Sequence, residues 1–173
     1  IESEVLRDSI LFKSNRLDLT MGGSMLTEQS HKYVDRKKQE EYIKRMRRTV
    51  YLPVLRSSGY DGQKAFDFPD PAVITGKRNV SSVTPQALYL MNSELIHKSS
   101  GALAEILLGD TRETGNKNRV SWLILHLLGR EATTAERERG EVFVSTYGEE
   151  ENSAAWAAFS RALFATNEFL YIQ

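Results

Sequence analysis

The 173-residue sequence contains no cysteine, and this absence excludes several kinds of chemistry. A cysteine nucleophile, a disulfide framework, a thiolate zinc or iron–sulfur site, and covalent attachment of haem to the chain itself all require that side chain. We therefore expect no cofactor within this domain. Any redox chemistry associated with it has to reside in another polypeptide segment.

An excess of one charge and a long apolar run are also missing. The 23 Lys and Arg residues balance 23 Asp and Glu residues, so the chain lacks the positive field of a dedicated nucleic-acid-binding protein. Without an apolar signal segment or a membrane-length run, we expect no direct membrane insertion. The opening Ile1-Glu2-Ser3-Glu4 has no initiator Met. We interpret residues 1–173 as a single domain excised from a larger protein.

Apolar residues at helical spacing are the main structural signal. The clearest stripe runs from Val120 to Leu128 and ends at Gly129, and Thr133 and Glu136 have the spacing of a capping box. Helices are predicted to include residues 2–14, 84–91, 93–109, 120–128, 133–143 and 153–163. This pattern predicts a mainly α fold, with five or six helices around one core.

Two short segments rich in β-branched residues interrupt the helical pattern. Residues 48–55 and 72–75 are predicted to be strands that form a minor two-stranded element, with Pro53 confining the first to an edge. The long connection at 56–71 contains Phe66 and Phe68, which favour an ordered loop. The alternative fold class is α+β.

The polar residues of this region suggest two kinds of site. Asp67 and Asp70 have the side chains required for cation binding or acid–base chemistry, but we favour a turn at Asp70 and an arginine partner for Asp67. Arg47, Arg48 and Arg78, with Lys77 beside them, are suited to an anion site. Structural Arg–Asp pairing is the alternative that we favour.

No catalytic or metal-binding residue is predicted. The three histidines form no close ligand pair, and Pro71 and Arg78 stand where a phosphate-binding loop requires glycine and a hydroxyl. Gln86 and Asn92 have amides that either face a cleft or, as we favour, satisfy helix backbone groups. The candidate polar cluster therefore consists of Arg48, Asp67, Asp70, Arg78, Asn79 and Gln86.

A local basic run occupies residues 32–48, where eight Lys and Arg against three Asp and Glu give a net charge of +5. Tyr33 and Tyr42 lie within it, as in some polyanion-binding segments. Because acidic residues are interspersed, we favour a solvated helix with local ion pairs.

Several ordered strings carry a family resemblance. They are RRTVYL at 47–52, FDFPDP at 66–71, GKRNV at 76–80, TPQALYLMN at 84–92, LGREAT at 128–133 and NEFLY at 167–171, together with Glu4, Arg7, Asp8 and the segment 17–23. The sequence resembles the planctomycete-type C-terminal domain of unknown function (PSD1-like), which occurs in multidomain proteins with a cytochrome c-like haem domain. The resemblance implies an extracytoplasmic or envelope location and other domains of the same polypeptide, including a haem domain, as partners. It implies no established reaction.

Two functions are consistent with these observations. The first is a non-catalytic assembly or interaction domain of a large bacterial envelope protein, because no nucleophile and base have usable spacing. The second is an enzyme or binding domain that acts on an anionic polysaccharide through the loop at residues 66–79.

Overall fold

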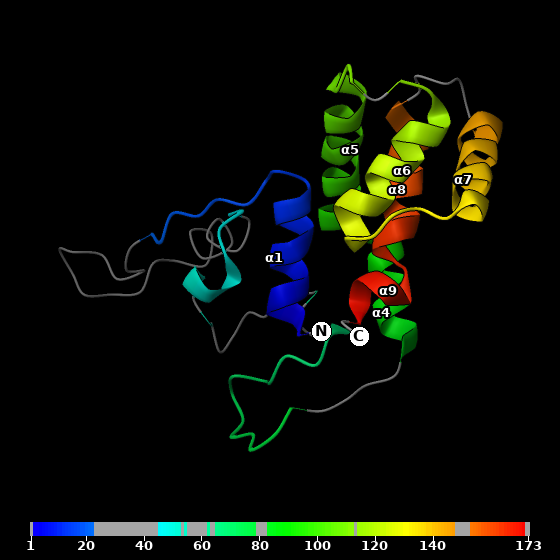
Figure 1. Ribbon diagram of the computed structural model, residues 1–173. Coiled ribbons are helices and arrows are strands. Elements are labelled where there is room, and N and C mark those ends of the chain that lie inside the picture. Colours follow the sequence, from blue (N-terminus) through cyan, green and yellow to red (C-terminus); the bar gives the residue numbers. More distant parts are fainter. Residues whose placement is uncertain are drawn as a thin grey trace.

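The fold is mainly helical. A computed structural model describes residues 2–22, 45–52, 54, 62, 65–78, 83–112, 114–147 and 153–171. Seven α-helices lie within these residues: α1 (Ser3–Lys13), α4 (Val83–Asn92), α5 (Glu94–Gly109), α6 (Asn116–Leu128), α7 (Thr134–Tyr147), α8 (Ser153–Phe164) and α9 (Asn167–Leu170). A 3-10 turn, η1 (Thr49–Tyr51), precedes α4 (Figure 1). The predicted helices at 2–14, 84–91, 93–109, 120–128, 133–143 and 153–163 are therefore confirmed, and α9 is added to them, whereas most of the helix favoured for 32–48 lies outside the described residues.

Local signals set several of the helix ends. Ser93 Oγ accepts a hydrogen bond from Ile96 N at the start of α5, and Gly129 adopts the left-handed conformation with φ 74° after α6. The capping box is also present, since Glu136 Oε2 accepts from Thr133 N at 2.8 Å and Thr133 Oγ1 accepts from Glu136 N at 3.3 Å.

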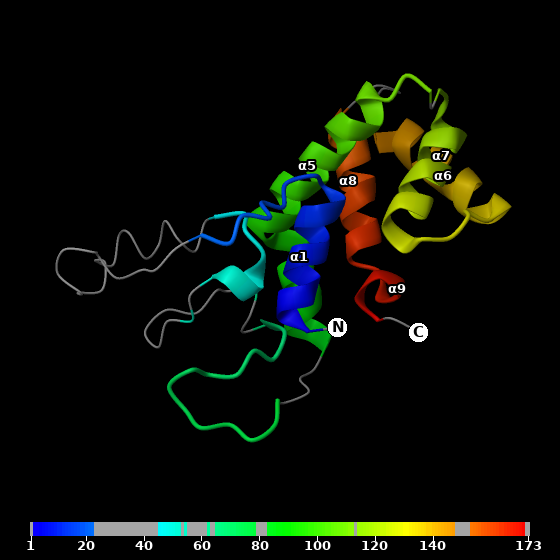
Figure 2. The ribbon, with the colours of Figure 1, turned by 60° about the vertical axis from the view of Figure 1, so that its left-hand side comes forward.

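The core lies between α5, α6, α7 and α8, with α8 at its centre. Trp156 and Phe164 of α8 are fully buried, as are Leu103 of α5 and Val144 of α7. Helices α5 and α8 contact each other, and both bury small residues: Ser99, Ser100 and Ala104 on α5, and Ala155, Ala157 and Ser160 on α8. Helix α1 contacts α5 on the other side of the bundle and adds Leu6 and Ile10 to the same core (Figure 2).

A reciprocal contact fixes the C-terminal end of α1 to α6. His126 Nε2 donates to the carbonyl oxygen of Lys13 at 2.8 Å, while Lys13 Nζ donates to the carbonyl oxygen of His126. The His126 ring stacks on Trp122 with a centroid separation of 4.6 Å. This histidine therefore has a packing role.

The predicted two-stranded β element is wrong for the residues that the structure describes, because no strand occurs there. At 72–75, Asp70 bends the chain: its Oδ1 accepts from Ala72 N at 2.9 Å and its carbonyl accepts from Val73 N at 3.1 Å. Residues 49–51 form η1 in place of a strand. The local turn chemistry of Asp70 thus overrides the β propensity of Val73 and Ile74.

Candidate functional site

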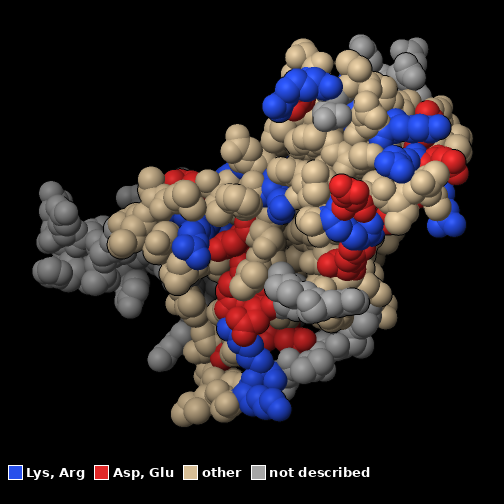
Figure 3. Space-filling model, in the orientation of Figure 1, with Lys and Arg blue, Asp and Glu red and all other residues tan. Residues whose placement is uncertain are grey.

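An open groove of about 730 Å³ lies between α1, the η1 segment and the loop at 66–78; we call it the α1–η1 groove. Its polar lining consists of Glu2, Glu4, Asp8, Ser9, Arg48, Thr49 and Arg78. Its apolar lining consists of Val5, Phe12, Leu17, Val50, Leu52, Val54, Phe68, Pro69 and Pro71. Figure 3 shows acidic side chains gathered over the α1 region. The groove therefore combines apolar walls with charged groups.

Arg78 joins the loop to the first turn of α1. Its Nη1 and Nη2 donate to the two carboxylate oxygens of Glu4 at 2.9 and 2.7 Å, and its guanidinium lies over the Phe68 ring at 5.6 Å. The hydrogen bonds from Arg78 lower the pKa of Glu4 to about 2. Glu4 is therefore ionised at neutral pH and is unsuited to act as a general acid there.

Asp8 and Arg7 hold the η1 segment against α1. Asp8 Oδ1 accepts from Thr49 N at 2.8 Å and from Thr49 Oγ1 at 2.7 Å. Arg7 donates to the carbonyl oxygens of Arg47 and Arg45 at 2.8 and 2.7 Å. Both side chains are thus engaged in joining segments that are some forty residues apart in the chain.

Asp18 extends this network to the segment that follows α1. Its side chain accepts from the backbone and hydroxyl of Thr20, both at 2.9 Å, and its backbone forms an isolated parallel bridge with Arg47. The Thr20 hydrogen bonds, with smaller contributions from Arg47, lower the pKa of Asp18. This arrangement favours a structural role for Asp18.

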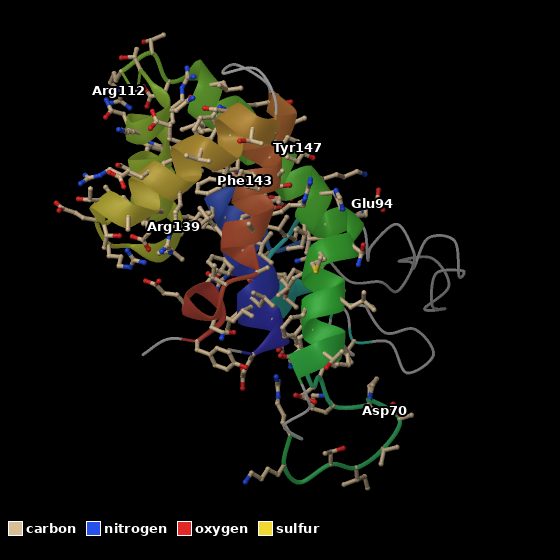
Figure 4. All side chains as sticks on the ribbon, turned by 90° about the vertical axis from the view of Figure 1, so that its right-hand side faces the viewer. Asp70, Glu94, Arg112, Arg139, Phe143 and Tyr147 are labelled. Carbon is tan, nitrogen blue, oxygen red and sulfur yellow. The ribbon has the colours of Figure 1, made fainter. Side chains whose placement is uncertain are left out.

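The structure brings together two residues of the candidate polar cluster. Arg48 and Arg78 both line the α1–η1 groove, and Arg48 Nε lies 3.9 Å from Asp8 Oδ2. Asp67 and Asp70 do not line it; Asp70 forms the turn described above, and Figure 4 shows it on the loop that projects from the bundle.

The other two members of the cluster are elsewhere. Gln86 is half-buried on α4 and is not part of the groove lining, whereas Asn79 lies outside the described residues. The basic run at 32–48 is described only from residue 45 onward. Glu4, Asp8 and Thr49 were not predicted as site residues, although all three belong to the strings that carry the family resemblance.

Among the described residues that line the groove, no hydroxyl has a histidine base beside it. Thr49 Oγ1 donates instead to the Asp8 carboxylate at 2.7 Å. Within the part of the chain that the structure describes, no group of three or more His, Asp and Glu residues is arranged to hold a metal. The described helices also include none that is long and apolar enough to cross a bilayer.

A second hollow of about 630 Å³ lies on the outer face of α7, where Val142, Phe143 and Tyr147 meet Arg139. The Phe143 and Tyr147 rings stack at 5.7 Å (Figure 4). None of the predicted site residues lines this hollow, and it lies apart from the network around α1.

Comparison with known proteins identifies the family. Residues 1–144 match the family PSD1, described as a protein of unknown function (DUF1553), and the chain therefore belongs to that family. No curated protein and no solved structure gives a match.

Proposed function

We propose that this chain is a non-catalytic assembly domain whose α1–η1 groove binds an apolar segment of another domain of the same polypeptide. The observation that carries the proposal is that the groove's charged side chains already have partners, whereas its apolar side chains are exposed. The charged side chains of Glu4, Asp8 and Arg78 bind one another or the backbone, whereas Phe12 and Val50 remain 65% and 70% exposed.

The exposed apolar walls provide a source of binding free energy. Phe12, Val50 and Val54 lie on both sides of the groove, and covering an apolar side chain of this size contributes about 1–2 kcal/mol. The lining has three carboxylates against two guanidinium groups, a net charge of −1. An apolar segment with one basic side chain is therefore the best complement.

The wider setting follows from the family resemblance. It supports a place in a large multidomain bacterial envelope protein, outside the cytoplasm, beside a cytochrome c-like haem module. In that setting this domain holds other modules in position and contributes no reacting group. The strings at 47–52, 66–71 and 76–80, which carry the resemblance, each contribute residues to the lining of the α1–η1 groove.

An anionic polysaccharide bound through the loop at 66–79 is the second candidate. The half-exposed side chain of Arg48 favours it. The net negative lining opposes it, and Arg78 already binds Glu4 with both of its terminal nitrogens. Binding of a sulfated or uronic glycan to the chain, lost in Arg48→Ala, would support this candidate over docking.

Hydrogen exchange tests the docking proposal. Amide exchange is measured for residues 45–52 in the 173-residue chain and in the intact parent polypeptide. We expect these amides to exchange at least tenfold more slowly in the parent, because the bound segment excludes water from the groove. The amides of α7 are the control and keep their rates. Equal exchange of 45–52 in both forms would contradict docking at this groove.

A further inference from the structure

The loop at 66–78 leaves the body of the protein beside the groove and returns to it at Arg78. Phe66 anchors one end, because it is buried in the core and meets Tyr89 edge-on at 5.9 Å. The Arg78–Glu4 pair anchors the other end. Between these two anchors the chain projects away from the helices in all three ribbon views (Figures 1, 2 and 4).

Local hydrogen bonds shape the projecting part. Asp70 accepts from Ala72 N and Val73 N, and Thr75 Oγ1 donates to the carbonyl oxygen of Val73 at 3.3 Å. Pro69 and Pro71 restrict the backbone on either side of Asp70. A loop that is already ordered loses less conformational entropy when it binds a partner than a free segment does.

This ordered loop presents two adjacent aliphatic side chains to water. Ile74 is fully exposed and Val73 is 62% exposed, although both are residues that folded proteins usually bury. We propose that Val73 and Ile74, which we call the loop tip, insert into a concave apolar pocket of the domain that occupies the α1–η1 groove. This inference rests on the proposed function and adds a second contact to it.

The chemistry of the loop favours a protein partner. Its charged residues are Asp67, Asp70, Lys77 and Arg78, which balance, and Arg78 is already bound to Glu4. A lipid surface attracts clusters of basic residues and selects Trp and Tyr at its interface, and residues 66–78 contain neither Trp nor Tyr nor such a cluster. A convex aliphatic tip instead fits a pocket on a folded domain.

Thiol labelling tests the loop tip, because the chain has no cysteine of its own. Three single variants are compared in the 173-residue chain and in the intact parent polypeptide: Ile74→Cys at the tip, Phe12→Cys in the groove, and Val142→Cys on the outer face of α7. Modification by a maleimide is followed by peptide mass spectrometry. We expect labelling of Ile74→Cys and of Phe12→Cys to be at least tenfold slower in the parent, with Val142→Cys unchanged.

The outcomes separate the loop tip from the groove. If Phe12→Cys is protected in the parent while Ile74→Cys is labelled equally in both forms, the proposed insertion of the loop tip is wrong and the proposed function stands. If each of these two variants is labelled at the same rate in the 173-residue chain and in the parent, both the proposed function and the insertion of the loop tip are wrong. Binding of the wild-type chain to phosphatidylglycerol–phosphatidylcholine vesicles, lost in Ile74→Asp, would assign the tip to a lipid surface and overturn the protein partner.

Discussion

Outside the groove, Arg130 forms ionic contacts with two carboxylates at once. Its guanidinium binds Glu136 at 2.6 and 2.9 Å and Glu168 at 2.5 and 2.8 Å, and it also donates to the carbonyl oxygen of Glu131 at 3.0 Å. The hydrogen bonds from Arg130 lower the pKa of Glu136 to about 2 and also lower that of Glu168. One side chain thereby joins the end of α6, the start of α7 and the start of α9.

Replacing Arg130 is expected to loosen this junction. Arg130→Ala should lower the free energy of unfolding by about 1–2 kcal/mol, because bidentate pairs are lost but the site is partly exposed to solvent. Urea denaturation followed by circular dichroism measures the change. Arg112→Ala is the matched control: its pair with Asp110 spans only two residues and its side chain is exposed, so a clearly smaller change than that of Arg130→Ala is expected. Equal effects of the two substitutions would contradict the role of Arg130 in joining α6, α7 and α9.

The lowered carboxyl pKa values predict how stability depends on pH. Glu4 and Glu136 have pKa values of about 2 in the folded protein against an ordinary value of 4.5. Their contribution is therefore complete above about pH 5 and is lost as pH falls from 4.5 to 2. We expect Glu4→Gln/Glu136→Gln to be less stable than wild type at pH 6 by about 1–2 kcal/mol, after allowance for solvent screening.

Denaturation midpoints at pH 6, 4 and 2.5 provide the measurement. The difference between the wild type and the double variant should shrink steadily toward the lowest pH. A difference that stays constant over this range would show that these two carboxylates do not control the acid response.

At the level of elements, glycines on two helices have opposite structural roles. A Cβ atom added at Gly140 of α7 would lie 2.7 Å from Val120 Cγ2 and 3.0 Å from Phe159 Cζ, whereas one added at Gly101 of α5 would meet no atom within 4 Å. Gly140 therefore allows the close approach of α7 to α6 and α8. Gly101 has no such function.

Alanine at these two glycines should change stability in opposite directions. Gly140→Ala is expected to destabilise the protein by about 1–3 kcal/mol through overpacking. Gly101→Ala is expected to stabilise it by about 0.5–1 kcal/mol, because alanine favours the helix. Thermal melts measure both changes. Adding Val120→Ala to Gly140→Ala should make the loss of stability caused by Gly140→Ala smaller, because the Val120 methyl groups that the new Cβ would meet are removed. Stabilisation by Gly140→Ala alone would contradict the close packing of α7 against α6 and α8.

The helices and turns also show which parts of the structure could be predicted from the sequence. The stripe from Val120 to Leu128 and the Thr133–Glu136 box act within one helix or turn, and both were confirmed. The contact of Asp8 with Thr49 joins residues 41 positions apart, so no local pattern reports it. For the groove, Arg48 and Arg78 were predicted, whereas Glu4 and Asp8 were not, because ordinary helix-surface acids resemble them in sequence. The sequence also did not predict that Asp67 adopts a left-handed backbone conformation, with φ 58°.

For the whole molecule, the folded unit extends beyond the family match. The match ends at residue 144, within α7, yet α8 supplies the fully buried Trp156 and Phe164 at the centre of the bundle. Helices α5, α6 and α7 therefore depend on a segment that the match does not include. The family boundary is not the boundary of the core.

A chain ended at residue 144 should consequently lack a cooperative thermal transition, because the apolar faces of α5 and α6 would be open to water. In the intact chain, Trp156→Ala should lower the free energy of unfolding by about 3–5 kcal/mol. Leu125→Ala, at an exposed position of α6, is the control and should change it by less than about 0.5 kcal/mol. Cooperative melting of the shortened chain would contradict the central role of α8.

Helix α1 uses its two faces for different purposes. Leu6, Ile10 and Leu11 are buried in the core, while Val5 and Phe12 face the groove on the opposite side. Substitutions at Val5 and Phe12 can therefore change the surface of the groove and leave the core packing of α1 in place. A display library randomised at those outer positions should yield binders for new peptides that retain the parental melting temperature.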